Sequence, residues 1–530
     1  MASSSEDMWV LSMDRLVAQN MARNDNDRRQ NCSVYRIPAV IRKLRPQCYD
    51  YEVIPLGLYN RDFRDVTPMV QLELEVVAVW FKHLPDPNGW TNFCSRVAEP
   101  PPDHEGTSLE DFYHDTPVDS SITPPMVRSV LVLDAVFIAS KLVLKYDGDD
   151  PAVPSAFEVD ILELFRRNNI QCHESSISRD IGLVFENQVP LYLVQNVWGL
   201  YFGDGSRFEM CLKNYVLQLV LNLLPMHIVI SSSKLLDFEG CNHILEYVHK
   251  AVCLDINATS ATAGSGNGSS AARRFTGWLS RYLAYLKTVA ELETNPGTTH
   301  SAGSETSWAA AGTGRMFRRL KLPEKGGTNS ATTKRFMGRR TLPTVTELRK
   351  AGIRFRGVQT GICGIRFEKS FFNLKATLNL PQLRISDGTE KLLLNLCAFE
   401  SMKVPDHKRK VTAFVLLMDE LISTEEDVQL LRKGPEPVIS VNKTGEDKGV
   451  ANLFNILQNF DGSIGIGDLK IVIKEIHAWN DTRWRHQVTH FMDRFVIAPW
   501  IVIAMVASTI LLAATLLQTV YTVEGFYHPK

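Results

Sequence analysis

Four side chains that can bind a metal ion lie close together near the middle of the sequence. They are Cys241, His243, His249 and Cys253, all within thirteen residues. Thiolate sulfur and imidazole nitrogen are ligands that zinc prefers, but this spacing matches no standard zinc module. The segment CNHILEYVHKAVC instead has the apolar periodicity of an amphipathic helix. We therefore predict a helix here, with no metal ion and no cofactor.

Two carboxylates, Asp134 and Glu186, lie among apolar residues, where the pKa of a carboxyl rises and acid–base chemistry becomes possible. Glu186 begins the trio Glu186-Asn187-Gln188, and Pro190 disfavours helical geometry just after it, so the trio is predicted at a helix end or turn. The sequence places no nucleophile or second acid beside either carboxylate. We interpret both as structural and not catalytic; a hydrolase site around Glu186 or Asp134 is the alternative.

The overall composition excludes several other classes of protein. Net charge is −1 over 530 residues, which argues against a dedicated nucleic-acid binder. The nine cysteines form no Cys-x-x-Cys pair and suit a reducing compartment. The His-Glu-x-x-His and Gly-x-Ser-x-Gly patterns of metalloproteases and serine hydrolases are both absent.

The C-terminal region contains a long uncharged segment, from Phe495 to Val523. Within it, Trp500 to Tyr521 is 22 residues, which as a helix would extend roughly 33 Å and cross a bilayer core of about 30 Å. Trp500 and Tyr521 stand where interfacial aromatic residues belong. The segment predicts a single-pass transmembrane helix, with membrane lipid as a partner.

Charges flanking this segment predict its orientation. Arg483, Arg485 and Arg494 precede it, whereas only Lys530 follows it, so the positive-inside rule places the preceding body in the cytoplasm. The N-terminal thirty residues contain no secretory signal, which favours a tail-anchored protein, with the plasma membrane as its expected location. Five Asn-x-Ser/Thr sequons argue for the opposite side, but a chain of this length contains several by chance.

The periodicity along the chain predicts a mainly α fold with a small β-hairpin element, made of a helical body and one C-terminal transmembrane helix. Helices are predicted around Val127 to Leu142 and from Ala156 to Arg167, a short helix is predicted to end at Gly352 before a strand, and a hairpin within 367–385. The divisions are a polar tail (1–30), a helical region (31–255), a flexible and partly basic insert with one amphipathic helix (256–340), a second region (341–494), the transmembrane helix (495–523) and a short tail (524–530).

Short blocks along almost the whole chain resemble, in order, a plant family called domain of unknown function 247. The blocks are Tyr35-Arg36-Ile37-Pro38, Gly57-Leu58-Tyr59-Asn60, Leu133-Asp134-Ala135-Val136-Phe137, Phe185-Glu186-Asn187-Gln188-Val189-Pro190, Thr346-Glu347-Leu348 with Ala351-Gly352-Ile353-Arg354-Phe355, Asn395-Leu396-Cys397-Ala398-Phe399-Glu400, Pro499-Trp500 and Gln518-Thr519-Val520-Tyr521. Departures at Leu58, Asn60 and Ala135 indicate a divergent member.

The resemblance implies a mainly helical, membrane-attached plant protein from a family without an established catalytic activity. Ten residues of its blocks are expected to be structural: Pro38, Asp134, Glu186, Asn187, Gln188, Pro190, Glu347, Gly352, Asn395 and Glu400. Some members are associated with self-incompatibility in grasses, which implies recognition of a protein partner. We therefore expect a membrane-anchored, non-enzymatic interaction protein, with the insert as its partner-specific surface.

Overall fold

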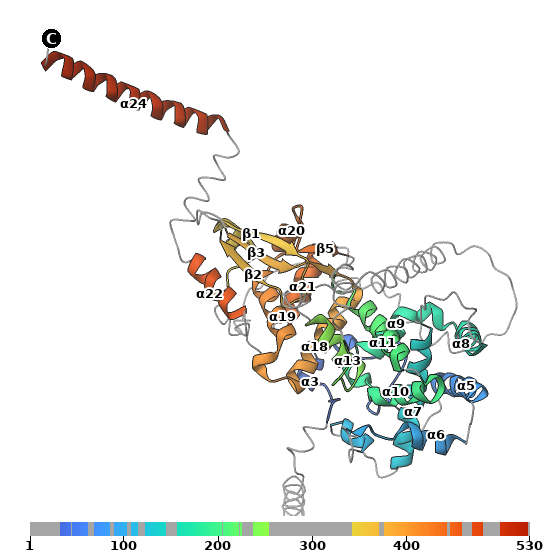
Figure 1. The fold of residues 1–530 in the computed structure, drawn as a ribbon. Coiled ribbons are helices and arrows are strands. Elements are labelled where there is room, and N and C mark those ends of the chain that lie inside the picture. Colours follow the sequence, from blue (N-terminus) through green and yellow to red (C-terminus); the bar gives the residue numbers. More distant parts are fainter. Residues whose placement is uncertain are drawn as a thin grey trace, which may run out of the picture.

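The computed structural model is mainly helical, with two small sheets (Figure 1). It describes residues 32–43, 45–61, 68–84, 89–102, 108–114, 122–144, 156–203, 205–221, 223–224, 237–253, 342–369, 376–442, 446–457, 469–480 and 499–527. The insert, its predicted amphipathic helix and the N-terminal tail lie outside these residues.

The regular elements of the first part of the chain, among its described residues, are all helices. Its elements are α3 (Ala39–Arg42), α4 (Pro46–Tyr49), α5 (Pro68–His83), α6 (Trp90–Val97), η2 (Leu109–Phe112), α7 (Pro124–Val143), α8 (Ala156–Arg167), η3 (Ile170–His173), α9 (Glu174–Gly182), η4 (Phe185–Asn187), α10 (Leu191–Phe202), α11 (Gly205–Val220) and α13 (Ile244–Val252). The predicted helices α7 and α8 are confirmed.

Helix α7 lies at the centre of this half. Every residue from Leu131 to Val143 is buried, so the helix is enclosed on all sides rather than on one stripe. It packs against α5, α6, α10 and α11. Pro124 and Pro125 begin the helix, where a missing N–H costs nothing. Burial on every side forces the polar side chain of Asp134 into the core, where it must find a partner.

The second part combines helices with the sheets. Its elements are α17 (Val345–Lys350), β1 (Ile353–Val358), β2 (Arg366–Lys369), β3 (Ala376–Pro381), β4 (Leu383–Ile385), α18 (Asp387–Lys403), η5 (Asp406–Lys408), α19 (Lys410–Leu421), α20 (Glu425–Arg432), β5 (Ile439–Asn442), α21 (Asp447–Leu457) and α22 (Leu469–Asn480). One sheet has the order β1-β3-β2 and the other pairs β4 with β5.

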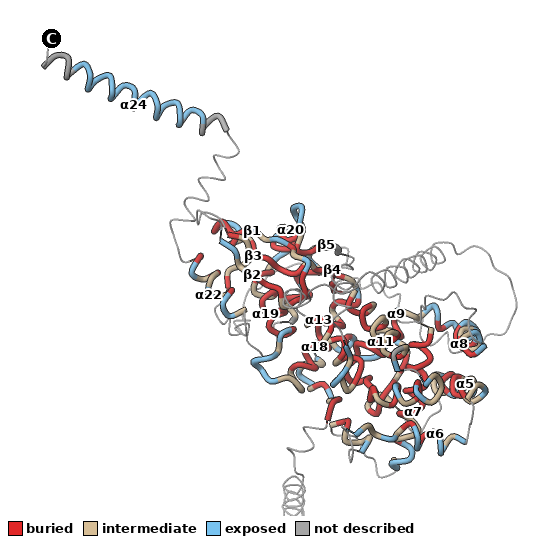
Figure 2. The backbone as a smooth tube through the Cα atoms, viewed as in Figure 1, coloured by how far each residue is buried: buried red, intermediate tan, exposed pale blue. Residues whose placement is uncertain are grey.

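The predicted hairpin is confirmed as the antiparallel pair β2 and β3. The structure adds a parallel neighbour, β1, which pairs with β3 from Ile353 opposite Ala376 to Val358 opposite Pro381. The short helix α17 and the strand after Gly352 are confirmed as well. Buried residues of both halves join in one core, as Figure 2 shows for α7, α11, α18 and β3.

The last described element is α24 (Pro499–Tyr527), where we predict a transmembrane helix. No helix within the described residues is both long and apolar enough to cross a membrane, so that prediction is not confirmed. Every α24 side chain that the structure describes is exposed (Figure 2), and Tyr521 is 69% exposed. The side chain of Trp500 lies outside the described part.

Candidate functional site

Glu186 and Asn187 lie in η4, between α9 and α10, and Gln188 is its C-cap, so the trio lies at a turn as predicted. Glu186 accepts hydrogen bonds from the backbone N–H of Ile37, at 2.6 Å, and from the Arg42 guanidinium. Its carboxylate therefore fixes the segment before α3, whose N-cap is Pro38. Both oxygens are occupied by structural donors.

The two amides of the trio satisfy backbone groups of neighbouring segments. Asn187 Oδ1 accepts from Leu56 N at 2.6 Å, and its Nδ2 donates to the carbonyls of Ile54 and Asp180. Asn187 is fully buried, and an unsatisfied buried polar group costs about 1–3 kcal/mol. The amide thus replaces the secondary structure that this irregular segment lacks.

Gln188 performs the same task on the other side of η4. Its Oε1 accepts from Leu245 N at 2.9 Å, near the start of α13, and its Nε2 donates to the carbonyls of Ile181 and Val184. Pro190 is the N-cap of α10. The two amides therefore connect α9 to the start of α13 through hydrogen bonds.

Asp134 belongs to a buried charge cluster. It accepts from Gly57 N at 2.8 Å and from Arg61, which also binds Glu73. Burial raises the pKa of Asp134, and it raises the pKa of Glu73 to about 8 with help from the Asp134 charge. One cation serves two carboxylates, and burial beside the Asp134 charge favours a proton on Glu73.

Asn395 and Glu400 connect the second half of the chain to the first. Asn395 Oδ1 accepts from Phe185 N at 2.9 Å, and its Nδ2 donates to Cys48 O at 2.8 Å. Glu400, which is buried, accepts from the N–H groups of Val411 and Thr412 at the start of α19. A carboxylate is favoured at a helix N-terminus.

Glu347 and Gly352 define the ends of α17. Glu347 forms a capping box with Thr344, and Gly352 follows the helix at φ +84°, a conformation that glycine adopts most readily. All ten motif residues thus lie at turns, helix ends or core junctions. None of the ten lines the cavity described below, among the residues that the structure describes.

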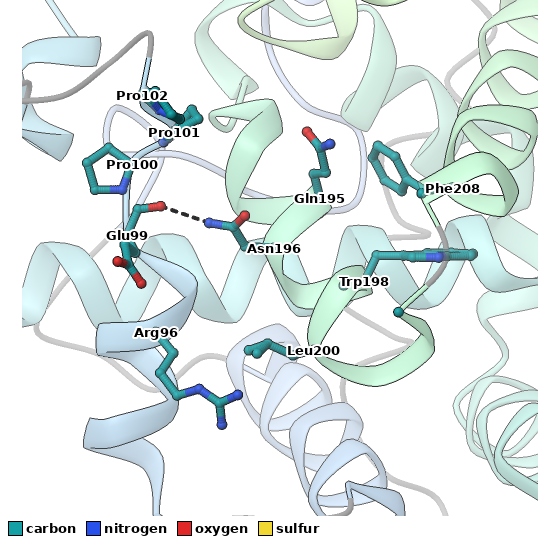
Figure 3. A pocket seen from close by; sticks show the side chains of 13 residues that line it. Arg96, Glu99, Pro100, Pro101, Pro102, Gln195, Asn196, Trp198, Leu200 and Phe208 are labelled. Atoms are coloured by element: carbon teal, nitrogen blue, oxygen red, sulfur yellow. Dashed lines mark hydrogen bonds between the residues drawn. The ribbon is translucent and has the colours of Figure 1, made fainter.

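A cavity of about 800 Å³ lies between the end of α6, the Pro100-Pro101-Pro102 segment and α10 (Figure 3). Asn196 Nδ2 donates to the carbonyls of Val97 and Glu99, both at 2.9 Å, and so holds the end of α6 against α10. The lining of the cavity also contains Trp198, Phe208, Gln195 and Arg96. Sequence reasoning missed this cavity, because its walls come from segments about a hundred residues apart.

The structure places the four candidate metal ligands in different surroundings. His243 is the N-cap of α13, where its Nδ1 accepts from Glu246 N and its Nε2 lies 3.2 Å from Ser33 O. The predicted helix is present but begins only at Ile244, which places Cys241 before it. His249 and Cys253 instead meet Glu400: the ligand atoms of these three residues all lie within 4.8 Å of one another.

Two residues of this neighbourhood were not recognised as candidate ligands from the sequence. Glu400 comes from α18, and Cys363, whose Sγ donates to Cys253 O at 3.4 Å, comes from the segment between β1 and β2. Both are more than a hundred residues from α13 along the chain. Only tertiary packing brings them to it, so no local spacing could have indicated them.

The fold and its polar junctions define a class of protein: a mainly helical body in which a buried Glu-Asn-Gln turn connects the helices. A family model described as a plant protein of unknown function, DUF247, matches residues 34–514. The chain belongs to this family.

Two UPF0481 proteins of Arabidopsis thaliana are similar to this chain. One is 23% identical over 400 residues, covering 69% of this chain and 72% of the relative. The other is 27% identical over 194 residues, covering 34% of this chain and 37% of the relative. No solved structure matches the chain significantly.

Proposed function

We propose that this protein is a membrane-attached, non-enzymatic interaction protein. The observation that supports the proposal is that both candidate acid–base carboxylates already accept hydrogen bonds from structural donors. Asp134 binds Gly57 N and Arg61, and Glu186 binds Ile37 N and Arg42. A general acid or base must reach a substrate proton, whereas these carboxylates are held by backbone and arginine donors. For this reason we prefer the interaction role to the alternative of a hydrolase around Glu186 or Asp134.

Helix α24 supports membrane attachment. Ile510, Leu511 and Leu512 are consecutive and each more than 60% exposed, so the apolar surface extends around the helix instead of forming one stripe. An exposed apolar surface of this kind marks a contact with lipid or with another apolar partner. We propose lipid, and the cytoplasmic face of the plasma membrane as the position of the body.

The hydroxyl groups of α24 fit a lipid environment. Thr515, Thr519 and Thr522 each donate to the carbonyl four residues earlier, at 2.6–2.8 Å. In a bilayer core these donors would find no water, and an unsatisfied group would cost several kcal/mol. Bonding within the helix removes that cost.

Membrane attachment is tested by cutting the chain after Asp493 and comparing it with the full chain and with a control lacking only 525–530. We expect the full chain and the control to remain in carbonate-washed membranes and the shortened chain to be released. Protease protection of the same membranes reports the side on which the body lies. Retention of the shortened chain would overturn the attachment through α24.

The proposal of partner recognition rests on family membership, since some members of the family are associated with self-incompatibility. We propose that residues 256–340 determine the choice of partner, and that attachment to a membrane raises the effective concentration of weak contacts. The test exchanges 257–340 with the corresponding segment of a relative, followed by affinity capture from native membranes. Unchanged partners after the exchange would contradict this role for the segment.

A further inference from the structure

We propose that His249, Cys253, Cys363 and Glu400 form a binding site for one divalent metal ion of the zinc type. These residues come from three parts of the fold: the end of α13, the segment between β1 and β2, and α18. They supply one nitrogen, two sulfurs and one oxygen, which is a ligand set that zinc accepts. The proposed site is independent of the proposed membrane attachment.

The distances around His249 are close to those that a tetrahedral ion requires. Cys253 Sγ lies 3.5 Å from His249 Nε2, and zinc bond lengths give a sulfur-to-nitrogen separation of about 3.6 Å in a tetrahedron. Glu400 Oε1 lies 2.7 Å from the same nitrogen, compared with about 3.3 Å in a tetrahedral zinc site. Loss of the hydrogen bond between these two atoms would leave room for the ion.

The proposed fourth ligand, Cys363, lies outside the set of three residues whose ligand atoms are all within 4.8 Å of one another, so its side chain must turn toward the ion. Its Sγ donates to Cys253 O at 3.4 Å, and its side chain also shares a hydrogen bond with the side chain of Cys253. Both cysteines and His249 are partly exposed, whereas Glu400 is buried. Glu400 is therefore the innermost residue of the cluster, and the other three lie nearer the surface.

A nucleophilic cysteine is the competing interpretation of this cluster, and the geometry disfavours it. A Cys-His-Glu relay needs the carboxylate on one ring nitrogen and the thiol on the other. Here Cys253 Sγ and Glu400 Oε1 both approach Nε2 of His249. A single nitrogen cannot donate to the carboxylate while it accepts from the thiol, but an ion can replace both contacts.

The charges in the cluster permit the exchange of protons for an ion. Binding would release one proton from each coordinating thiol to solvent and form one sulfur–metal bond in its place. Two thiolates and Glu400 then carry three negative charges against two positive charges on the ion. The cation Lys410 lies near Cys253 and offsets the remainder.

The position of the site suggests what the ion would do. Cys253 is the C-cap of α13 and the last described residue before the insert, while Cys363 follows β1 on the other side of it. An ion would connect the end of α13, after which the insert begins, to the segment that follows α17 and β1 in the second part of the chain. It would thereby hold the base of the segment for which we propose partner choice.

The test uses the full chain in detergent, reduced and freed of metal, titrated with zinc chloride by calorimetry. We expect one zinc ion per chain and, with Co²⁺ instead, the sulfur-to-metal charge-transfer absorption of thiolate ligation. Cys253→Ser and Cys363→Ser should each weaken zinc binding at least 10-fold. Cys172→Ser removes an exposed cysteine outside the cluster and should leave binding unchanged, as should Cys241→Ser.

Circular dichroism of each variant shows whether it is folded. The cysteines are substituted instead of Glu400, because the buried Glu400 also holds the start of α19 and its substitution would change the fold as well as the site. Binding that persists in Cys253→Ser, or a zinc stoichiometry near zero in the reduced chain, would overturn the proposal. So would a Cys253–Cys363 disulfide that withstands reduction and prevents zinc binding.

Discussion

At the scale of residues, buried carboxylates and amides hold the irregular segments of this protein. Asp180 is one example: it accepts from the backbone N–H groups of Glu52, Val53 and Ile54, at 2.7–3.1 Å, and from Lys391. Segments without a helix or strand must find such acceptors, because buried N–H groups are almost always paired. The polar residues of the family blocks serve the same requirement.

Arg61 is the residue on which the Asp134 cluster most depends. We expect Arg61→Leu to lower the free energy of unfolding by about 3–5 kcal/mol, because it leaves the Asp134 carboxylate buried without a cation. Urea unfolding measures the change. The matched control is Arg356→Leu, whose bidentate pair with Glu436 is half exposed and should matter little. Equal effects of both substitutions would contradict this account of the cluster.

Glu73 should make the stability of the protein fall as pH rises. Its pKa is raised to about 8 by burial and by the Asp134 charge, so the folded state keeps a proton that the unfolded state has already released above pH 4.5. The stabilisation is complete below pH 4.5 and falls as pH rises from 4.5 to about 8, by at most about 1.4 kcal/mol for each pH unit. Above about pH 8 it is fully lost. Glu73→Gln imitates the protonated form and should remove this dependence in urea unfolding at pH 5, 6.5 and 8. Equal pH dependence in both proteins would refute it.

At the scale of elements, local pattern predicts what local interactions determine. The helices α7 and α8, the short helix α17 and the β2–β3 hairpin follow from periodicity, caps and turns. The parallel pairing of β1 with β3 and the pairing of β4 with β5 do not, because parallel partners are far apart in sequence and their register depends on packing.

The candidate metal site shows the same contrast between what the local pattern predicts and what packing determines. The apolar period of residues 241–253 predicts a helix but not its first residue, so it cannot show that His243 caps the helix while His249 turns toward α18. Glu400 is visible in the sequence as part of a family block, but its proximity to His249 arises only from the contact of α13 with α18. Cys363 carries no local signal at all.

Two glycines test the packing of elements. A Cβ at Gly357 in β1 would lie 2.1 Å from Pro437 O, whereas one at Gly199 in α10 meets nothing within 4 Å. We expect Gly357→Ala to destabilise by about 1–3 kcal/mol, because β1 or the segment before β5 must move. Gly199→Ala should stabilise by about 0.5–1 kcal/mol, since alanine favours a helix. Thermal unfolding of both variants measures the contrast, and a tolerated Gly357→Ala would argue against the close approach of β1 to Pro437.

At the scale of the whole molecule, the parts before and after the insert form one body. Lys391 of α18 binds Glu52 and Asp180 of the first part, and Lys403 donates to Cys32 O. The apolar cores of the two parts are continuous. Neither 31–255 nor 341–494 should therefore fold stably when expressed alone, while the two expressed together should associate. A separately folded 31–255 segment, detected by a cooperative thermal transition, would show that the junction is dispensable.

Asn395 provides the most direct test of this junction, because one side chain serves both parts. Asn395→Leu would leave Phe185 N and Cys48 O unsatisfied in the core, at a cost of about 1–3 kcal/mol for each group. Since η4, α4 and α18 meet at this residue, hydrogen exchange should quicken in all three, and not in α18 alone. The control is Asn455→Leu, which removes a longer and partly exposed bond to Ser423 O within the second part. Faster exchange confined to α18 would mean that the Asn395 side chain does not couple the two parts.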